Sequence, residues 1–180
     1  MNIRNKRGMT LVEIIVASAV TSVVLMAVTQ VMFVSRQAIV QTAVECDLAA
    51  QAVSVADRIA NELKDGVLST VTPTGTTPTT TLTFQKCLGY GTSAMTMSTP
   101  ITFEPYLDPI RNVWCVRRTE NGGTMELTDA LKPNFNNTIG IGLQFSRFDT
   151  TVNHDIYYVS VTLVRGSFSV TRSTKVQLKF

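Results

Sequence analysis

The sequence predicts an α+β fold in which a long N-terminal helix, its first half spanning a membrane, packs on an antiparallel β-sheet. Three observations lead to this fold class. An uncharged apolar run lies near the N-terminus, neither Gly nor Pro occurs between Gly8 and Gly66, and apolar and polar residues alternate after residue 82. The first two favour one long helix, and the third is typical of strands.

The composition excludes several classes of protein. The 180 residues are 44% hydrophobic and 16% charged, with a formal net charge of +3. That charge is too small to indicate a nucleic-acid clamp. The lone His and the widely spaced Cys46, Cys87 and Cys115 cannot form a zinc finger from adjacent ligand pairs.

The first element is a membrane-spanning helix, predicted over residues 9–35. The stretch Ile14–Ser35 holds 22 consecutive uncharged residues, which as a helix would extend roughly 33 Å and match a bilayer core of about 30 Å. The basic residues Arg4, Lys6 and Arg7 precede it. The positive-inside rule therefore places the N-terminus in the cytoplasm and the bulk of the chain outside.

A secretory signal peptide is the main alternative for this segment. Ala17-Ser18-Ala19 spells a small-x-small cleavage pattern. Cleavage after Ala19 would leave the apolar stretch Val20–Val34 at the new N-terminus, and Glu13 interrupts the short preceding apolar region. We therefore favour the membrane-spanning helix.

The residues Arg7-Gly8-Met9-Thr10-Leu11-Val12-Glu13 resemble the class III signal of type IV prepilins and of the pseudopilins of type II secretion. The resemblance covers residues 4–40. It implies that a prepilin peptidase cuts between Gly8 and Met9 and that Met9 becomes N-methylated. It also implies that Glu13 pairs with the N-terminus of a neighbouring subunit, and that residues 1–8 are a cleaved leader.

Two departures from the family pattern point to a minor subunit. Many major pilins have a glycine and a proline where this chain has Ser22 and Gln30. Major type IV pilins often close a C-terminal loop with two cysteines, and here no Cys follows Cys115. Met9 stands where Phe is commonest, and we expect this change to permit processing. The closest likeness in size and layout is to the W-like pilus or J-like secretion minor subunits.

The helix is predicted to continue over residues 36–65 as an amphipathic segment. The uninterrupted helix would have about 55 residues and a length of roughly 80 Å. Seven apolar residues follow steps of three or four: Val40, Val44, Leu48, Ala52, Val55, Ile59 and Leu63. We expect this stripe to pack on the sheet. Gly66 should stop the helix, and the Thr/Pro-rich residues 66–83 are expected to form an extended linker.

Residues 84–180 are expected to form a β-rich outer domain. Leu82 and Phe84 alternate with Thr, and residues 112–120 and 124–131 flank a turn at Asn121-Gly122-Gly123. Alternation from Ile139 to Phe145 predicts another strand. Residues 156–164 and 168–180 predict a final pair joined at Arg165-Gly166-Ser167.

Each candidate catalytic group in the sequence has a simpler structural explanation, so we expect no enzyme activity. Gly140-Ile141-Gly142 lies in a strand pattern and lacks the third glycine and the helix of a dinucleotide loop. His154 stands between Asn153 and Asp155 in a predicted turn, where a lone imidazole is usually solvated.

Neither a metal, a cofactor nor a nucleic acid is expected as a partner. Glu104, Asp108 and Asp129 supply acidic side chains but no dense loop of calcium ligands. Arg117 and Arg118 are adjacent on a predicted strand, so their side chains should face opposite ways.

Cys87 and Cys115 form a candidate disulfide. Both lie in predicted strands of the outer domain, and outside the cytoplasm thiols can oxidise. The closed loop of about 28 residues would stabilise by roughly 3–4 kcal/mol. Two buried thiols are the alternative. Cys46 lies on the helix and is expected to stay unpaired.

The sequence thus predicts a non-enzymatic minor pilin or pseudopilin, a single-pass inner-membrane protein with a periplasmic C-terminal domain. The resemblance implies three partners: other pilin or pseudopilin subunits, the prepilin peptidase and an inner-membrane assembly platform. The alternatives are a pilus-associated adhesin, a competence pseudopilin for DNA uptake, and a membrane-tethered enzyme with an accidental leader. Without Arg4, Lys6 and Arg7 the chain has 13 basic and 13 acidic residues, so its basicity lies in the leader.

Overall fold

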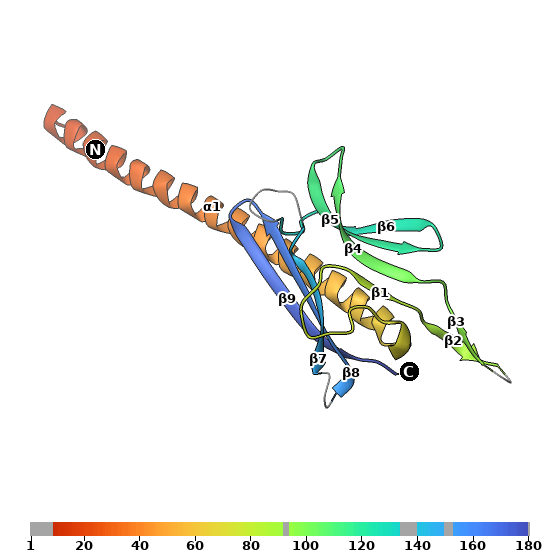
Figure 1. The fold of residues 1–180 in the computed structure, drawn as a ribbon. Coiled ribbons are helices and arrows are strands. Elements are labelled where there is room, and N and C mark those ends of the chain that lie inside the picture. Colours follow the sequence, from red (N-terminus) through yellow and green to blue (C-terminus); the bar gives the residue numbers. More distant parts are fainter. Residues whose placement is uncertain (1–8, 92–93, 134–139, 150–152, 180) are drawn as a thin grey trace, which may run out of the picture. The chain divides into compact units, whose positions relative to one another are not determined.

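The structure is a computed structural model that describes residues 9–91, 94–133, 140–149 and 153–179 (Figure 1). It divides into two units, residues 1–43 and residues 44–180. The helix α1 (Leu11–Leu63) contributes residues to both units. The predicted α+β class is confirmed, because one long apolar helix is followed by antiparallel sheets against which its later residues pack.

The helix ends at Leu63, and Gly66 shapes the turn that follows. The Gly66 N–H donates to the carbonyl of Leu63 at 2.8 Å. A Cβ added at Gly66 would lie 2.9 Å from that same oxygen, closer than real Cβ atoms come. Glycine is therefore required for the chain to leave the helix here.

The apolar stripe of α1 is buried within the second unit. Seven helix residues are buried: Leu48, Ala52, Val55, Ala56, Ile59, Ala60 and Leu63. Five of them belong to the seven-residue stripe that the sequence predicts. Val44 is partly buried, whereas Val40 lies in the first unit and is exposed.

The second unit contains a four-stranded antiparallel sheet in the order β1-β4-β5-β6. Its strands are β1 (Leu82–Phe84), β4 (Ile101–Asp108), β5 (Val113–Glu120) and β6 (Gly123–Thr128). The predicted turn between β5 and β6 is confirmed, since Asn121 and Gly122 adopt positive φ values of 49° and 78°. Such values match the twist of a tight hairpin.

The strand β4 was missing from the expectations. Pro105 stands at an apolar position in the alternation of Ile101, Phe103 and Leu107, and a Pro inside such a run argues against a strand. Pro105 lies beyond the part of β4 that pairs with β1, which ends at Phe103. Among the described residues no strand pairs with that edge of β4 at Pro105, and a residue without an N–H is tolerated in a strand with an open edge.

A three-stranded antiparallel sheet has the order β7-β8-β9. Its strands are β7 (Leu143–Asp149), β8 (Asn153–Arg165) and β9 (Phe168–Gln177). The predicted final pair is confirmed, and its turn contains Gly166 at a φ of 63°.

The strand predicted from Ile139 begins only at Leu143, so its expected start was wrong. The N–H groups of Ile141 and Gly142 both donate to the Lys132 carbonyl, at 3.0 and 2.9 Å. These N–H groups therefore bond to Lys132, and only the Gly142 carbonyl bonds to β8, where it accepts the Thr162 N–H at 2.6 Å. Ile139 itself lies outside the described residues.

The Thr/Pro-rich segment 66–83 belongs to the second unit and is bonded along its length. It contains the short helix η1 (Leu68–Thr70). Backbone bonds join Thr72 to Thr83, Thr79 to Phe145, and Gly75 to Arg147. The segment therefore bridges β1 and β7, one strand from each sheet.

A third, two-stranded sheet is the hairpin of β2 (Cys87–Tyr90) and β3 (Met95–Met97). Its base is fixed next to the end of α1, because the Cys87 N–H donates to the Asp65 carbonyl at 3.0 Å.

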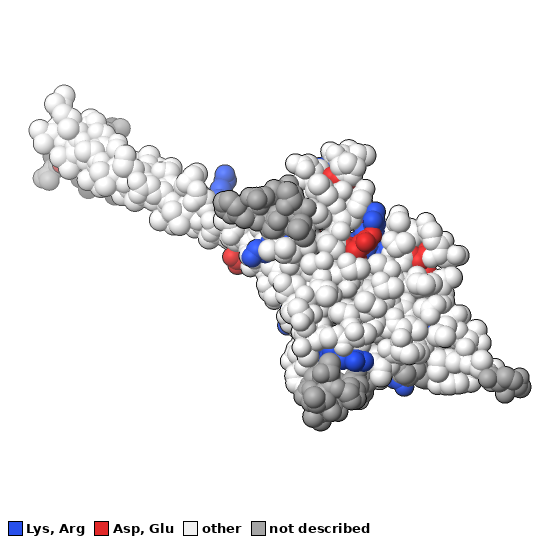
Figure 2. All heavy atoms as spheres, in the orientation of Figure 1, with Lys and Arg blue, Asp and Glu red and all other residues white. Residues whose placement is uncertain are grey.

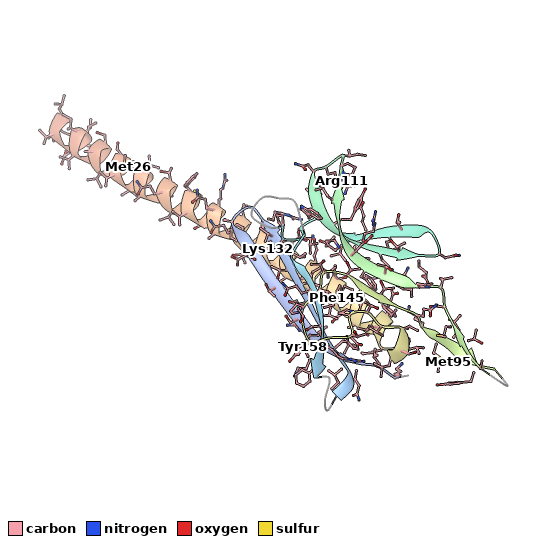
Figure 3. The ribbon with its side chains drawn as sticks, in the orientation of Figure 1. Met26, Met95, Arg111, Lys132, Phe145 and Tyr158 are labelled. Atoms are coloured by element: carbon pink, nitrogen blue, oxygen red, sulfur yellow. The ribbon has the colours of Figure 1, made fainter. Side chains whose placement is uncertain are left out.

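The core joins the stripe of α1 to the inner faces of the two larger sheets. Its largest fully buried side chains are Tyr157, Phe84, Phe103 and Phe145, the last labelled in Figure 3. The rings of Phe84 and Phe103 stack with centroids 6.3 Å apart. Fully burying each of the three Phe side chains contributes about 1.5–3 kcal/mol.

The outer faces of both sheets carry rows of hydroxyl groups, here called the hydroxyl rows. Thr83, Thr102, Thr119 and Thr124 stand opposite one another across all four strands of the first sheet. The Thr83 and Thr102 hydroxyls are hydrogen-bonded at 3.1 Å. Two more bonded pairs cross β8 and β9: Thr162 with Thr171 at 2.9 Å, and Ser160 with Ser173 at 3.0 Å. These rows cover part of the outer faces with uncharged polar groups.

Candidate processing and assembly site

The helix α1 begins with a reciprocal pair of hydrogen bonds between Thr10 and Glu13. The Thr10 N–H donates to Glu13 Oε2 at 2.8 Å, and the Glu13 N–H donates to Thr10 Oγ1 at 3.3 Å. Leu11 is the first helical residue, so Thr10 is the N-cap and Glu13 the third position of the helix. This is a capping box, which satisfies backbone donors that the first turn leaves unpaired.

The capping box holds the Glu13 carboxylate at the N-terminal end of the helix. The Thr10 hydroxyl also donates to Oε2, at 3.1 Å. Among the described residues, every hydrogen bond to this carboxylate ends on Oε2 and none on Oε1. The side chain is exposed within the first unit, so Oε1 is available to a donor from another chain.

Of the two residues at the predicted cleavage site, the structure describes Met9 but not Gly8. Gly8 lies outside the described residues, as do Arg4, Lys6 and Arg7. Met9 precedes the capping box and is 70% exposed. The predicted scissile bond thus stands immediately before a well-defined helix start. Sequence reasoning missed the role of Thr10, although a Thr three residues before Glu at the start of an apolar run is the capping-box signature.

The helix that follows Glu13 is apolar on every side. Its large apolar residues, from Leu11 to Val40, are all 48% or more exposed in the first unit. α1 is long and apolar enough to cross a membrane. Figure 2 shows the N-terminal part of α1 as a mostly white surface on the side in view. A helix that is apolar all round requires lipid or other helices around it.

The hydroxyl side chains in this stretch are satisfied inside the helix. Thr21 donates to the Ala17 carbonyl at 2.7 Å, and Ser22 to the Ser18 carbonyl at 2.8 Å. Ser18 and Thr29 make similar bonds to carbonyls three residues earlier. Polar groups that are bonded within their own helix avoid the cost of unpaired groups in hydrocarbon. Ser22 therefore continues the helix where many major pilins have a glycine.

A second acidic residue of α1, Glu62, ties the helix to the four-stranded sheet. Arg118 on β5 donates to it through Nε and Nη2, at 2.8–3.0 Å, and Lys86 Nζ donates at 3.0 Å. Burial alone would raise the pKa of Glu62, but the hydrogen bonds from Arg118 and Lys86 outweigh burial and lower the pKa. Arg118 also binds Glu120 at 2.6 Å. Sequence reasoning did not single out Glu62.

The neighbouring Arg117 faces the other side of the sheet, as expected for adjacent strand residues. Its Nη2 lies 2.5 Å from Glu104 Oε1, and its guanidinium lies 4.1 Å from the centre of the Tyr106 ring. Both arginines are thus paired with carboxylates of this chain.

The acidic residues considered for calcium are engaged separately. Glu104 pairs with Arg117, and Asp108 accepts the Ile110 N–H at 2.8 Å in the turn after β4. Asp129 lies 3.6 Å from Arg165. In the described parts of the chain no three His, Cys, Asp or Glu side chains gather in a group that could hold a metal.

The predicted disulfide between Cys87 and Cys115 is absent from the structure, in which both residues and Cys46 are free thiols. Cys87 lies in the β2–β3 hairpin, whereas Cys115 lies in β5 of another sheet. Each thiol donates to a carbonyl of its own strand two residues away, at 3.8 Å. Burial, with a smaller contribution from nearby carboxylates, raises the pKa of Cys115 to about 11. Its thiol therefore stays protonated near neutral pH and reacts slowly.

His154 belongs to β8 and not to a turn, because this strand begins at Asn153. Its side chain lies outside the described residues.

Comparison with known proteins agrees with the geometry at the N-terminus. A family model described as the prokaryotic N-terminal methylation motif matches residues 3–29. No curated protein and no solved structure matches the chain. Proteins with this motif are structural, not catalytic. The matched residues contain the predicted cleavage site, the capping box and most of the apolar stretch, so the chain carries a type IV prepilin-like class III signal. This signal and the long apolar helix fit a membrane-anchored precursor like a pilin or pseudopilin.

Proposed function

We propose that this protein is a minor pilin or pseudopilin, a structural subunit of a type IV pilus or a type II secretion pseudopilus without enzyme activity. Prepilin peptidase removes residues 1–8 and methylates the new N-terminus at Met9. Residues 9–35 span the inner membrane with the N-terminus in the cytoplasm, and residues 36–65 continue the helix into the periplasm. Residues 66–83 connect the helix to the periplasmic domain of residues 84–180.

One observation carries the proposal: the Glu13 carboxylate is presented at the start of α1, immediately before the 22 uncharged residues 14–35. Its Oε2 is held by Thr10, while Oε1 accepts no bond among the described residues. An isolated carboxylate in a membrane costs several kcal/mol, and a cation offsets that cost. The N-terminal amine of a neighbouring subunit supplies such a cation at the matching depth. Glu13 thereby sets the register of one subunit against the next.

The apolar segment serves two successive states. In the unassembled subunit, lipid covers its exposed Leu, Val, Ile and Met side chains. In the filament, the same side chains pack against helices of other subunits, as the all-round apolar surface requires. Ser22 and Gln30 keep the helix free of the glycine and proline typical of many major pilins, which favours a minor subunit.

The test compares Glu13→Ala with Glu45→Ala, an exposed acidic residue of the same helix within the second unit. Both variants should insert into the inner membrane and be cleaved after Gly8, as mass spectrometry of the mature N-terminus would show. Incorporation into sheared filaments should fall at least about tenfold for Glu13→Ala, because about 1.4 kcal/mol of lost pairing suffices for that factor.

The Glu45→Ala variant should incorporate normally. An intact Met1 or cleavage after Ala19 in the parent protein would refute the prepilin assignment. Normal incorporation of Glu13→Ala would refute the pairing role alone.

A further inference from the structure

The strands β2 and β3 carry three sulfur-containing side chains on one face, here called the sulfur cluster. Cys87 on β2 stands directly opposite Met97 on β3. Met95, labelled in Figure 3, is two residues before Met97 on the same strand, so both side chains belong to one face. Directly opposed Cβ atoms lie about 4.5–5.5 Å apart, and long side chains also reach diagonal neighbours. The flexible thioether side chains of both Met residues can therefore meet the thiol of Cys87.

The pairing of Cys87 with Met97 is fixed by hydrogen bonds on both strands. The Cys87 N–H donates to the Asp65 carbonyl at 3.0 Å, just past the end of α1. The Ser98 N–H donates to the Lys86 carbonyl and the Lys86 N–H to Ser98 Oγ, both at 2.9 Å. These bonds flank the pair, so its register is set by the body of the second unit.

The sulfur atoms of the cluster are accessible to a small solute. Cys87 is a free, partly exposed thiol whose Sγ donates to the Gly89 carbonyl at 3.8 Å, a weak sulfur bond. Met97 is 44% exposed and Met95 is partly exposed. Cys115, in contrast, is fully buried in another sheet.

The kinds of atom in the cluster indicate which metal it suits. Calcium and magnesium take oxygen ligands, and zinc is held by Cys, His or carboxylates. One thiolate with two thioethers favours monovalent copper, a soft ion. No charged residue occurs between Lys86 and Glu104, so the two strands supply no carboxylate for a hard cation. The expectation that no metal is bound weighed calcium loops and zinc fingers, neither of which uses Met.

We propose that the sulfur cluster binds one Cu(I) ion, with Cys87 as a thiolate ligand and Met95 and Met97 as thioether ligands. Three Cu–S bonds form, and the thiol proton of Cys87 passes to water. The ion remains Cu(I), so no electron is transferred. Because its ligands come from both strands, the ion joins β2 to β3 and stabilises a two-stranded hairpin, which alone is marginally stable. The inference goes beyond the proposed function and does not depend on prepilin processing.

Cys46 provides a control within the same chain. It is also a free thiol, and it is exposed on α1. No Met occurs within four residues of Cys46 in either direction, so neighbouring turns of the helix offer it no thioether. A thiol without thioether partners should hold Cu(I) less tightly than the sulfur cluster does.

The test uses the full chain, purified in detergent and kept anaerobic with ascorbate. Cu(I) is supplied as its complex with the coloured chelator bathocuproine disulfonate, and the loss of colour measures transfer to the protein. The parent chain should remove one Cu(I) per molecule. Cys87→Ser, Met95→Leu and Met97→Leu should each lower the affinity at least about tenfold, because losing even an outer-shell partner of a metal typically costs that much.

Two matched variants should leave the affinity unchanged: Cys46→Ser, and Met125→Leu at a 46% exposed position on β6. Leu nearly conserves the volume of Met, so the Met variants should fold as the parent does. X-ray absorption should find three sulfur neighbours around copper in the parent and fewer in Met97→Leu.

Three results would overturn the site. The parent chain could take no Cu(I) from the chelator. The uptake could disappear in Cys46→Ser and persist in Cys87→Ser. Both Met→Leu variants could bind like the parent, which would show a lone thiol. Zn²⁺ binding that requires Cys87 but neither Met residue, and that displaces Cu(I), would overturn the choice of metal.

Discussion

The two stretches of α1, residues 11–43 and residues 44–63, belong to one helix but differ in burial. The first has no buried residue within its unit, and its hydroxyl groups bond to its own carbonyls. The second buries one stripe and leaves polar residues on the other side. One continuous helix can therefore have two different surroundings along its length. The pattern of apolar and polar side chains decides which stretch is buried in the second unit.

Two glutamates of the helix, Glu13 and Glu62, show the same contrast. Glu13 bonds only to Thr10, three residues away, so its interactions are local. Glu62 is held by side chains far away in sequence, Lys86 and Arg118. Glu62 also pairs with Arg58 one helical turn earlier, but it is Lys86 and Arg118, two cations outside the helix, that join it to the sheet.

The largest difference between the two stretches should come from truncating a leucine in each. Leu48→Ala should lower the free energy of unfolding of the second unit by about 2–5 kcal/mol, because Leu48 is fully buried in the core. Leu25→Ala should leave that free energy unchanged, since Leu25 is 59% exposed in the first unit. Denaturant unfolding of the full chain in detergent, followed by the fluorescence of the single Trp114, measures both. Equal losses of unfolding free energy in the two variants would contradict the difference in burial between the two stretches.

A smaller effect is expected from the arginine pair on β5. Arg118→Ala should cost about 1–3 kcal/mol, because it leaves the half-buried Glu62 with fewer donors. Arg117→Ala should cost less than about 1 kcal/mol, since its partner Glu104 is on the outer face and reaches solvent. The same unfolding assay separates them, and a larger loss for Arg117→Ala would show that the inner ion pair does not anchor the helix.

The smallest expected effect is a dependence on acid pH. The folded state lowers the pKa of Glu62 below its ordinary value of 4.5. The stabilisation is therefore complete above that ordinary value and is lost as the pH falls through the lowered pKa of the folded state. Glu62→Gln should flatten the fall in unfolding free energy between about pH 6 and pH 3. Glu45→Gln serves as the control, and an unchanged slope in Glu62→Gln would assign the acid sensitivity to other carboxylates.

The elements that the sequence predicted are those with strong local signals. The helix follows from the absence of Gly and Pro, and the turn at Asn121 and Gly122 from residues that tolerate positive φ. The strand β4 was missed because Pro105 is acceptable only where β1 ends, and that end depends on the pairing of two distant segments. The start of β7 was misplaced for the same reason, since Lys132 draws the preceding residues away from the ladder.

The functional residues were likewise predictable only where a local sequence motif contains them. Gly8, Met9 and Glu13 come from a local motif, and Thr10 could have been added from the same seven residues. The role of Glu62 depends on Arg118, which is 56 positions away, and no local pattern contains it. The disulfide expectation rested on compartment and strand placement alone, and neither tells which sheets carry Cys87 and Cys115.

The hydroxyl rows determine how the assembled surface meets its surroundings. Hydroxyls that bond to one another across strands, as Thr162 and Thr171 do, carry no formal charge and attract no counterions. A surface built from them generates little field for dissolved salt to screen. Contacts made through these hydroxyl groups should therefore keep their strength from dilute water to brine.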